Sequence, residues 1–184
     1  MTPVAAQMSL WLFTALVLLV GLERVAELVV STRNAGRSLR NGGVEVGQGH
    51  YPFMVVLHTG LLVGALVEAW VLRSPFLPIL AATMFALVLL SQGLRWWCIA
   101  TLGSQWNTRV IVVPGMPRVN RGPYRRIPHP NYVAVVVEGF ALPLVHSAWV
   151  TAVVFTVANA VLLSVRIRAE NTALTSLVSE SGSA

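Results

Sequence analysis

The sequence predicts an all-α integral membrane protein with five membrane helices. Hydrophobic residues make up 55% of its 184 residues and charged residues only 11%, whereas about a quarter of a typical soluble domain is charged. The apolar residues are gathered in runs close to the roughly 20 residues that a helix needs to cross a bilayer. The length fits a single membrane domain that covers residues 1–184.

The first three spans follow from apolar runs at residues 8–30, 52–72 and 76–101. A signal peptide is the competing interpretation of the first run, but no basic segment precedes it and no small-residue cleavage site with a soluble domain follows it. The polar, glycine-rich stretch between the first two runs predicts turns. Its glycines are not a dinucleotide fingerprint, because no strand–turn–helix pattern surrounds them.

The fourth and fifth spans come from one long apolar stretch that is interrupted at "LPLVHSAW". Its two arms, residues 132–145 and 148–165, are short for complete spans. They predict a tight helical hairpin with Pro143 and Ser147 near the turn. Residues 166–178 then predict a short amphipathic helix on the cytoplasmic side, because their apolar and polar side chains separate onto two faces.

The arginines predict the orientation in the membrane, because cytoplasmic connections carry an excess of basic residues. Connections expected on one side contain Arg33, Arg37, Arg40, Arg109, Arg118, Arg121, Arg125, Arg126, Arg166 and Arg168. The short connections on the other side contain only Arg73. The N-terminus is therefore expected outside and the C-terminus in the cytoplasm. A bacterial inner membrane is expected because all 13 basic residues are arginine, as in proteins from GC-rich genomes.

Composition also argues against several classes of function. The net charge of +6 comes from arginines beside apolar runs, where topology and contact with anionic lipids explain them, so nucleic acid is not an expected partner. The single cysteine, Cys98, excludes an internal disulfide and a cysteine-cluster metal site. The histidines lack carboxylate partners at ligand spacing, and no metal site is predicted. The sequence does not predict an oligomeric state.

The stretch "RGPYRRIPHPNY", residues 121–132, concentrates polar side chains directly before an apolar run. Pro123, Pro128 and Pro130 restrict the backbone and block a helix, which predicts a stiff loop that enters a helix near Asn131. Side chains held in place in advance bind a ligand without spending free energy on ordering.

Two interpretations of this stretch compete, because arginine and tyrosine at a membrane edge are usually topology anchors and interfacial side chains. We prefer the anchoring interpretation for Arg118, Arg121 and Arg126. For Arg125 and His129 together we favour ligand binding, because both donors lie beside the three prolines.

The pattern "GPYR…HPNY", followed by an apolar hairpin and "RIRAEN", resembles the isoprenylcysteine carboxyl methyltransferase family, and its small bacterial branch in particular. The resemblance is strongest over residues 108–174. It implies an integral membrane methyltransferase that uses S-adenosylmethionine without a Rossmann fold. The cofactor would bind on the cytoplasmic side, in the region of residues 108–132 and 166–178, and a lipophilic acceptor would arrive through the membrane.

The resemblance implies roles for individual residues. The positions that match the family pattern are Gly122, Pro123, Tyr124, Arg125, His129, Pro130, Tyr132, Arg166 and Glu170. All but Arg166 are expected to bind the cofactor, whereas His129, Glu138 and Arg166 are the candidate catalytic residues. Arg125 suits the cofactor's carboxylate and Glu170 its ammonium or ribose hydroxyls. Tyrosine and tryptophan faces, Trp106 among them, suit adenine or the sulfonium. Two positions depart from the pattern: Pro128 replaces an arginine, and Asn171 replaces a second glutamate.

Four glutamates lie within or at the edges of apolar runs, where a carboxylate is costly unless it is paired or functional. Glu23 and Glu27 are one helical turn apart and predict an internal polar cluster that fixes helix packing. Glu68, near the outer side, is predicted to be structural. Glu138 lies less than two turns beyond Tyr132. Two roles stay open for Glu138, helix packing or acceptance of the acceptor's proton.

The expected function is methyl transfer from S-adenosylmethionine to an oxygen of a lipophilic, membrane-embedded acceptor, such as a phenol, an enol or a carboxylate. The acceptor would enter sideways from the bilayer, between the hairpin and an earlier helix. An NADPH-dependent membrane reductase of the sterol-reductase type is an alternative, because those enzymes carry a similar Arg-His-Pro-x-Tyr element. A non-enzymatic transporter or scaffold is another, but the densest polar chemistry lies at one membrane edge and not at mid-membrane.

Overall fold

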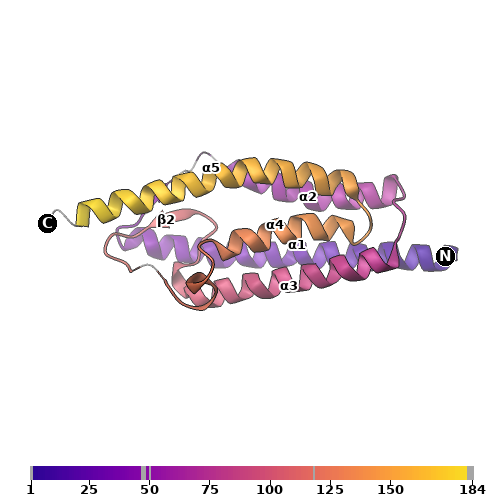
Figure 1. Ribbon diagram of the computed structural model, residues 1–184, viewed down its shortest axis with the longest axis horizontal. Coiled ribbons are helices and arrows are strands. Elements are labelled where there is room, and N and C mark those ends of the chain that lie inside the picture. The colour runs from indigo at the N-terminus through magenta and orange to yellow at the C-terminus, as the bar shows by residue number, and fades with distance from the viewer. Residues whose placement is uncertain (1, 47–48, 50, 118, 182–184) are drawn as a thin grey trace.

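The computed structural model describes residues 2–46, 49, 51–117 and 119–181; of Asn171 and residues 173–181 it describes the backbone alone. Five helices form an elongated bundle (Figure 1): α1 (Pro3–Arg40), α2 (Tyr51–Val71), α3 (Pro78–Leu102), α4 (Pro130–Leu144) and α5 (Trp149–Ser181). Two 3-10 turns, η2 (Gly103–Gln105) and η3 (Gly122–Arg125), and two strands, β1 (Val44–Val46) and β2 (Val110–Val112), lie in the connections. The apolar core centres on Phe13, Val17, Val88 and Leu142, which belong to α1, α3 and α4.

Four of the helices are long and apolar enough to cross a membrane. The qualifying segments are Pro3–Arg40, Tyr51–Val71, Pro78–Gln105 and Trp149–Glu170. They confirm an α-helical integral membrane protein. Helix α4 is apolar but has 15 residues, about 22 Å at 1.5 Å per residue, which is less than the ~30 Å hydrocarbon core. A fifth complete span therefore stays a prediction.

Helix α1 extends well beyond the predicted span, as far as Arg40. The prediction of turns directly after residue 30 is therefore wrong. Ser31, Asn34 and Ser38 are buried on one helix face. The Ser31 hydroxyl accepts a hydrogen bond from the Thr108 N–H at 2.9 Å, and the Asn34 amide donates to the Trp106 carbonyl at 2.9 Å. These polar residues continue the helix because they pack against the chain that follows α3.

Helix α5 is also longer than expected, because the predicted short C-terminal helix is not a separate element. Residues 166–178 continue α5 without a break as far as Ser181. The physical reason is local: no glycine or proline stands between Trp149 and Ser181, so nothing in the chain ends the helix where the apolar run ends.

The connection between α4 and α5 falls at the predicted interruption. Pro143 lies in the last turn of α4, and Ser147 turns the chain with a φ of 54°. Glu68 of α2 caps the start of α5, since its carboxylate accepts the Thr151 N–H and hydroxyl, both at 2.8 Å, and the Val150 N–H at 3.0 Å. Glu68 thus has the structural role that its position indicated.

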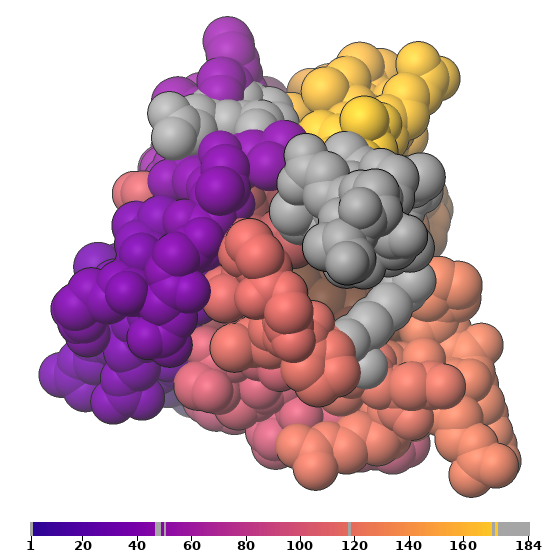
Figure 2. All heavy atoms as spheres, turned by 90° about the vertical axis from the view of Figure 1, so that its left-hand side faces the viewer, coloured from indigo at the N-terminus to yellow at the C-terminus, as the bar shows by residue number. Residues whose placement is uncertain are grey.

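The strands β1 and β2 are a departure from the all-α prediction. They pair antiparallel, with Val44 opposite Val112 and Val46 opposite Val110. Three residues per strand are too few for a recognisable alternation of apolar and polar side chains. The pair joins the end of α1 to the chain after α3, on the end of the bundle that faces the viewer in Figure 2.

Close packing of α4 on α5 generates a test of the fold. A Cβ added at Gly139 would lie 1.9 Å from Phe155 Cε1, and Phe155 is buried. We expect Gly139→Ala to lower the free energy of unfolding by about 1–3 kcal/mol, the usual range for overpacking. Thermal denaturation of the purified protein in detergent measures the effect.

Gly93→Ala is the matched control, because Gly93 lies inside α3 with nothing within 4 Å of the added Cβ. It should leave the melting temperature unchanged or raise it slightly, since alanine favours helix. Equal melting temperatures for the two variants would contradict the described packing of α4 against α5.

Candidate active site

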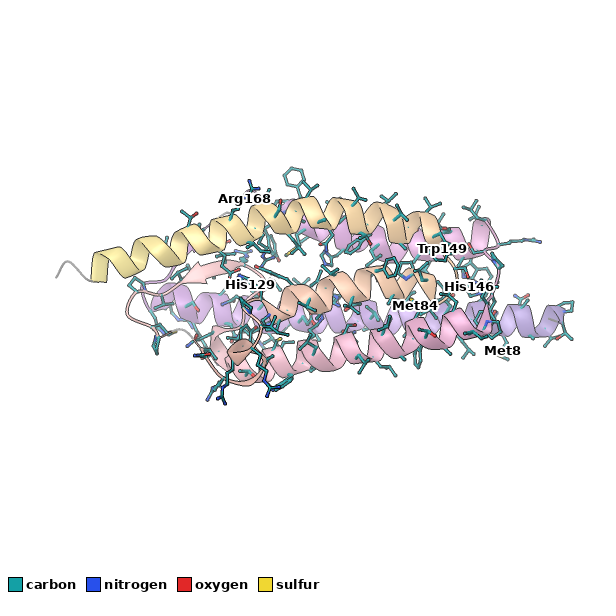
Figure 3. All side chains as sticks on the ribbon, in the orientation of Figure 1. Met8, Met84, His129, His146, Trp149 and Arg168 are labelled. Carbon is teal, nitrogen blue, oxygen red and sulfur yellow. The ribbon has the colours of Figure 1, made fainter. Side chains whose placement is uncertain are left out.

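The polar end of the bundle holds the start of α4. Figure 3 shows His129 at this end, where Arg168 also lies, whereas His146 and Trp149 lie at the opposite end. The described arginines with exposed side chains at this end are Arg33, Arg37, Arg40, Arg109, Arg121, Arg125, Arg126 and Arg168. Arg118 lies outside the described residues. The exposed arginines are thus concentrated at one end of the bundle, which is the distribution that the positive-inside argument needs.

A cavity of about 240 Å³, here called the end cavity, lies beside His129. Five of the nine residues that match the family pattern line it: Tyr124, His129, Tyr132, Arg166 and Glu170. The remaining wall comes mainly from the chain between α3 and η3, including Trp106, Asn107, Arg109 and the whole of β2. The structure therefore brings together residues from the proline-rich loop, α4 and α5.

Local sequence explains how these side chains meet. Pro130 occupies the first turn of α4, where its missing N–H costs nothing, and this fixes Tyr132 on the opening turn. Arg166 and Glu170 are four residues apart on α5, so their side chains share one helix face. Since α4 packs against α5, that face meets Tyr132.

A hydrogen-bond chain links the three residues. The Tyr132 hydroxyl donates to Glu170 Oε2 at 2.6 Å and accepts from Arg166 Nε at 3.0 Å. Arg166 also donates to the Thr108 carbonyl, and its Nη1 lies 2.6 Å from Met54 Sδ. His129 stacks on the Tyr132 ring with centroids 5.2 Å apart, and its Nδ1 lies 3.8 Å from Glu170 Oε2. The guanidinium and the two rings are consequently held in fixed positions.

A second cavity of about 150 Å³, here called the span cavity, lies between α1, α2, α4 and α5. Leu28, Val55, Leu62, Val135 and Leu162 make much of its wall apolar. It shares four lining residues with the end cavity: Trp106, Asn131, Tyr132 and Arg166. These four residues therefore form a common wall between a polar site at the bundle end and an apolar site among the membrane helices.

Four other predicted binding residues do not line either cavity: Gly122, Pro123, Arg125 and Pro130. Arg125 is exposed, whereas Pro123 and Pro130 are buried. Gly122 has a φ of 55°, and a Cβ there would lie 2.6 Å from Thr101 Oγ1. The segment "GPYR" therefore packs against α3 and places Tyr124 in the wall of the end cavity. It does not place the Arg125 guanidinium there.

Glu138 is held in ion pairs, which is not the environment expected of a carboxylate that accepts a proton from the acceptor. Its carboxylate is paired with Arg24 and with Arg95, whose Nη2 lies 2.9 Å away. Glu27 pairs with the same two arginines, at 2.7 Å and 3.5 Å. Glu138 is buried and lines neither cavity, so the geometry favours the packing role over proton acceptance. The polar cluster expected around Glu23 and Glu27 is confirmed for Glu27; Glu23 contacts Gln92.

Sequence reasoning missed two asparagines. The side-chain oxygens of Asn107 and Asn131 are buried and have no hydrogen-bond partner among the described residues. Asn107 lines the end cavity and Asn131 lines both cavities. Asn131 stands between the proline and the tyrosine of "HPNY", which was a usable signal, whereas nothing in the sequence marks Asn107.

Tyr124 lines the end cavity with a phenol that stays protonated. Burial, with smaller contributions from Cys98 and Glu170, raises the pKa of its phenol well above the usual range. The hydroxyl thus keeps its proton at any pH near neutrality.

Comparisons with known proteins identify the family of the chain. The family model described as the isoprenylcysteine carboxyl methyltransferase (ICMT) family matches residues 83–176, which include every candidate residue from Trp106 to Glu170. The chain is also 38% identical over 165 residues to "Uncharacterized protein YpbQ" of Bacillus subtilis (strain 168), a match that covers 89% of this chain and 95% of that protein. The chain therefore belongs to the isoprenylcysteine carboxyl methyltransferase family.

Proposed function

We propose that the protein transfers a methyl group from S-adenosylmethionine, bound in the end cavity, to an oxygen of a lipophilic acceptor bound in the span cavity. The observation that carries the proposal is the common wall of the two cavities, formed by Trp106, Asn131, Tyr132 and Arg166. A charged, water-soluble donor and an apolar acceptor need separate sites that meet at one point, and this arrangement suits that need.

The residues of the end cavity fit the cofactor's groups. Glu170 offers acceptor oxygens suited to an ammonium and to ribose hydroxyls. So do the side-chain oxygens of Asn107 and Asn131, which have no hydrogen-bond partner among the described residues. Arg109 lines the same cavity and is a donor suited to a carboxylate. Trp106, Tyr124 and the valines of β2 are suited to an adenine ring. When bound, the cofactor supplies a sulfonium-activated methyl group.

Arg166 and Tyr132 orient the reactants in this proposal. Arg166 has hydrogen bonds to Tyr132 and Thr108 and a contact with Met54, so its guanidinium cannot swing away from the common wall. Its remaining N–H groups are suited to hold the acceptor oxygen. Trp106 is 2% exposed and helps to exclude water from the meeting point, which in-line transfer between two positioned reactants requires.

His129 is the candidate proton acceptor, because histidine is the side chain that most often serves as a general base and His129 lines the end cavity. Its Nδ1 faces Glu170 Oε2 at 3.8 Å, so the carboxylate would stabilise the imidazolium that forms. Glu138, neutralised by two arginines, is not needed for this step.

The acceptor is proposed to be an amphiphile with a phenolic, enolic or carboxylic oxygen, entering from the bilayer beside α4 and α5. The end cavity would face the cytoplasm, in agreement with the arginines around it, and the membrane would be the bacterial inner membrane. Lateral entry keeps the alkyl chain out of water, at a saving of about 0.8 kcal/mol per CH₂.

Cofactor binding tests the choice of cavity. Glu170→Gln removes a carboxylate that lines the end cavity, and we expect the dissociation constant for S-adenosylhomocysteine to rise about tenfold, as for loss of a charge-assisted hydrogen bond. Isothermal titration calorimetry of the purified protein measures it. Arg125→Ala, outside the cavity, should leave the constant unchanged.

In the reverse result, Arg125→Ala would weaken S-adenosylhomocysteine binding and Glu170→Gln would not. That result would indicate that Arg125 binds the cofactor carboxylate, as the sequence pattern implied, and would contradict the end cavity as the cofactor site. Tighter binding of NADPH than of S-adenosylhomocysteine would favour a reductase instead.

Acceptor length tests the span cavity. With labelled S-adenosylmethionine and a series of alkylphenols, methyl ether formation should increase with chain length until the cavity is filled, as mass spectrometry of the extracted lipids would show. Val135→Phe, which narrows the span cavity, should reduce turnover of long-chain phenols at least tenfold with little effect on S-adenosylhomocysteine binding.

Val136→Phe is the matched control, because Val136 is the next residue of α4, is exposed and lines neither described cavity. Equal turnover of short and long phenols, or equal effects of the two substitutions, would remove the support for an acceptor in the span cavity.

A further inference from the structure

The span cavity contains an amide that the proposed methyl transfer does not use. Asn159 lies in the middle of α5, between valines and alanines, and is only 2% exposed. It lines the span cavity, yet no hydrogen bond among the described residues involves its side chain. A buried amide without a partner is costly in an apolar environment, so a ligand group inside the cavity is the natural partner.

His58 supplies a second polar atom to the same cavity. Its Nδ1 lies 2.8 Å from the Met54 carbonyl oxygen, and because a carbonyl only accepts, Nδ1 carries the hydrogen. In the neutral ring Nε2 is then a hydrogen-bond acceptor, and no bond among the described residues uses it. Its ring meets Phe155 edge-on at 5.4 Å. Phe155 is one turn from Asn159 on α5, so His58 and Asn159 lie at nearly the same depth.

This pair lies deeper in the bundle than the common wall of the cavities. Asn159 precedes Arg166 by seven residues on α5, and His58 follows Met54, the contact of Arg166, by one turn of α2. At 1.5 Å per residue the separation along the bundle is on the order of 6–10 Å. A ligand group at His58 and Asn159 therefore cannot be the oxygen that meets the cofactor at Arg166.

The neighbouring charges indicate that this group is uncharged. Arg24 and Arg95 also line the span cavity, but Glu27 and Glu138 pair with both of them. Two guanidinium groups balanced by two carboxylates add no net charge beside the pair, and Arg166, the third arginine of the cavity lining, belongs to the common wall. An acceptor nitrogen on His58 together with an amide on Asn159 instead matches a hydroxyl, which donates to the first and accepts from the second.

We propose that His58 and Asn159 bind a second hydroxyl of the acceptor, placed along its chain on the hydrocarbon side of the oxygen that is methylated. The substrate class is thus an amphiphile with two separated oxygens. The identity of the reacting oxygen rests on the proposed function, but the hydroxyl site stands on the geometry of the span cavity alone.

Two probes with the same chain length test the site. One is meta-pentadecylphenol, and the other is its analogue with a hydroxyl on the second carbon of the chain. Quenching of tryptophan fluorescence gives the dissociation constant of each, because Trp106 lines the cavity, and methyl transfer is followed separately. The intact protein should bind the hydroxylated probe about tenfold more tightly.

Asn159→Leu and His58→Phe should each reduce this preference to about twofold or less. Asn159→Ala provides a further variant if leucine disturbs folding, and S-adenosylhomocysteine binding reports that each variant is folded. Thr156→Val is the matched control: Thr156 lies one turn from Asn159 on α5, but its hydroxyl is already bonded to the Ala152 carbonyl at 2.7 Å. It should keep the tenfold preference.

Equal affinity of the intact protein for the two probes would overturn the proposal, as would a preference that survives all the substitutions at Asn159 and His58. Selective binding without methyl transfer would support the hydroxyl site and count against the proposed function. If both probes were methylated but bound with equal affinity, the result would support the proposed function and count against the hydroxyl site.

Discussion

The rest of the structure depends on the ion pairs of Glu138 with Arg24 and Arg95, which join α4 to α1 and α3 inside the bundle. A charge among apolar helices is costly unless it is paired, and removing one partner from a buried pair leaves an uncompensated charge. Sliding or rotation of α4 relative to its neighbours would separate the carboxylate from both guanidinium groups. Glu138 therefore fixes the position of a helix too short to be held in place by the bilayer alone.

The position of α4 in turn sets the geometry of both cavities. Asn131 and Tyr132 lie in its first turn and belong to the common wall, and the Tyr132 hydroxyl joins Arg166 and Glu170 of α5. The opposite end of α5 is fixed by Glu68, which accepts the first backbone N–H groups of the helix. Helix α5 is thus held at its start by a carboxylate of α2 and, towards the polar end of the bundle, by the contacts of Arg166 and Glu170 with Tyr132 of α4.

Much of this arrangement follows from local sequence, because hydropathy gives the spans and the interruption at Pro143 and Ser147 separates α4 from α5. His129, Tyr132, Arg166 and Glu170 could be found because they match the family pattern that the sequence resembles. The four-residue spacing of the last two also places them on one helix face. The surroundings of Arg125 and Glu138 could not, because exposure and ion pairing depend on segments far apart in the chain. Asn107 and Asn159 carry no pattern at all, and only the cavities that they line distinguish them.

The two cavities differ in the polarity of the side chains that line them. Polar side chains and backbone from the chain after α3 surround the end cavity, whereas leucine and valine from the membrane helices form much of the span cavity. A charged reactant and an apolar one can each remain in a suitable environment only if the boundary between them is a few side chains thick. Tyr132 and Arg166 meet that condition, because both reach the two cavities and hold each other by a hydrogen bond of 3.0 Å. On the proposed function, the wall that separates the reactants is thus also the place where they meet.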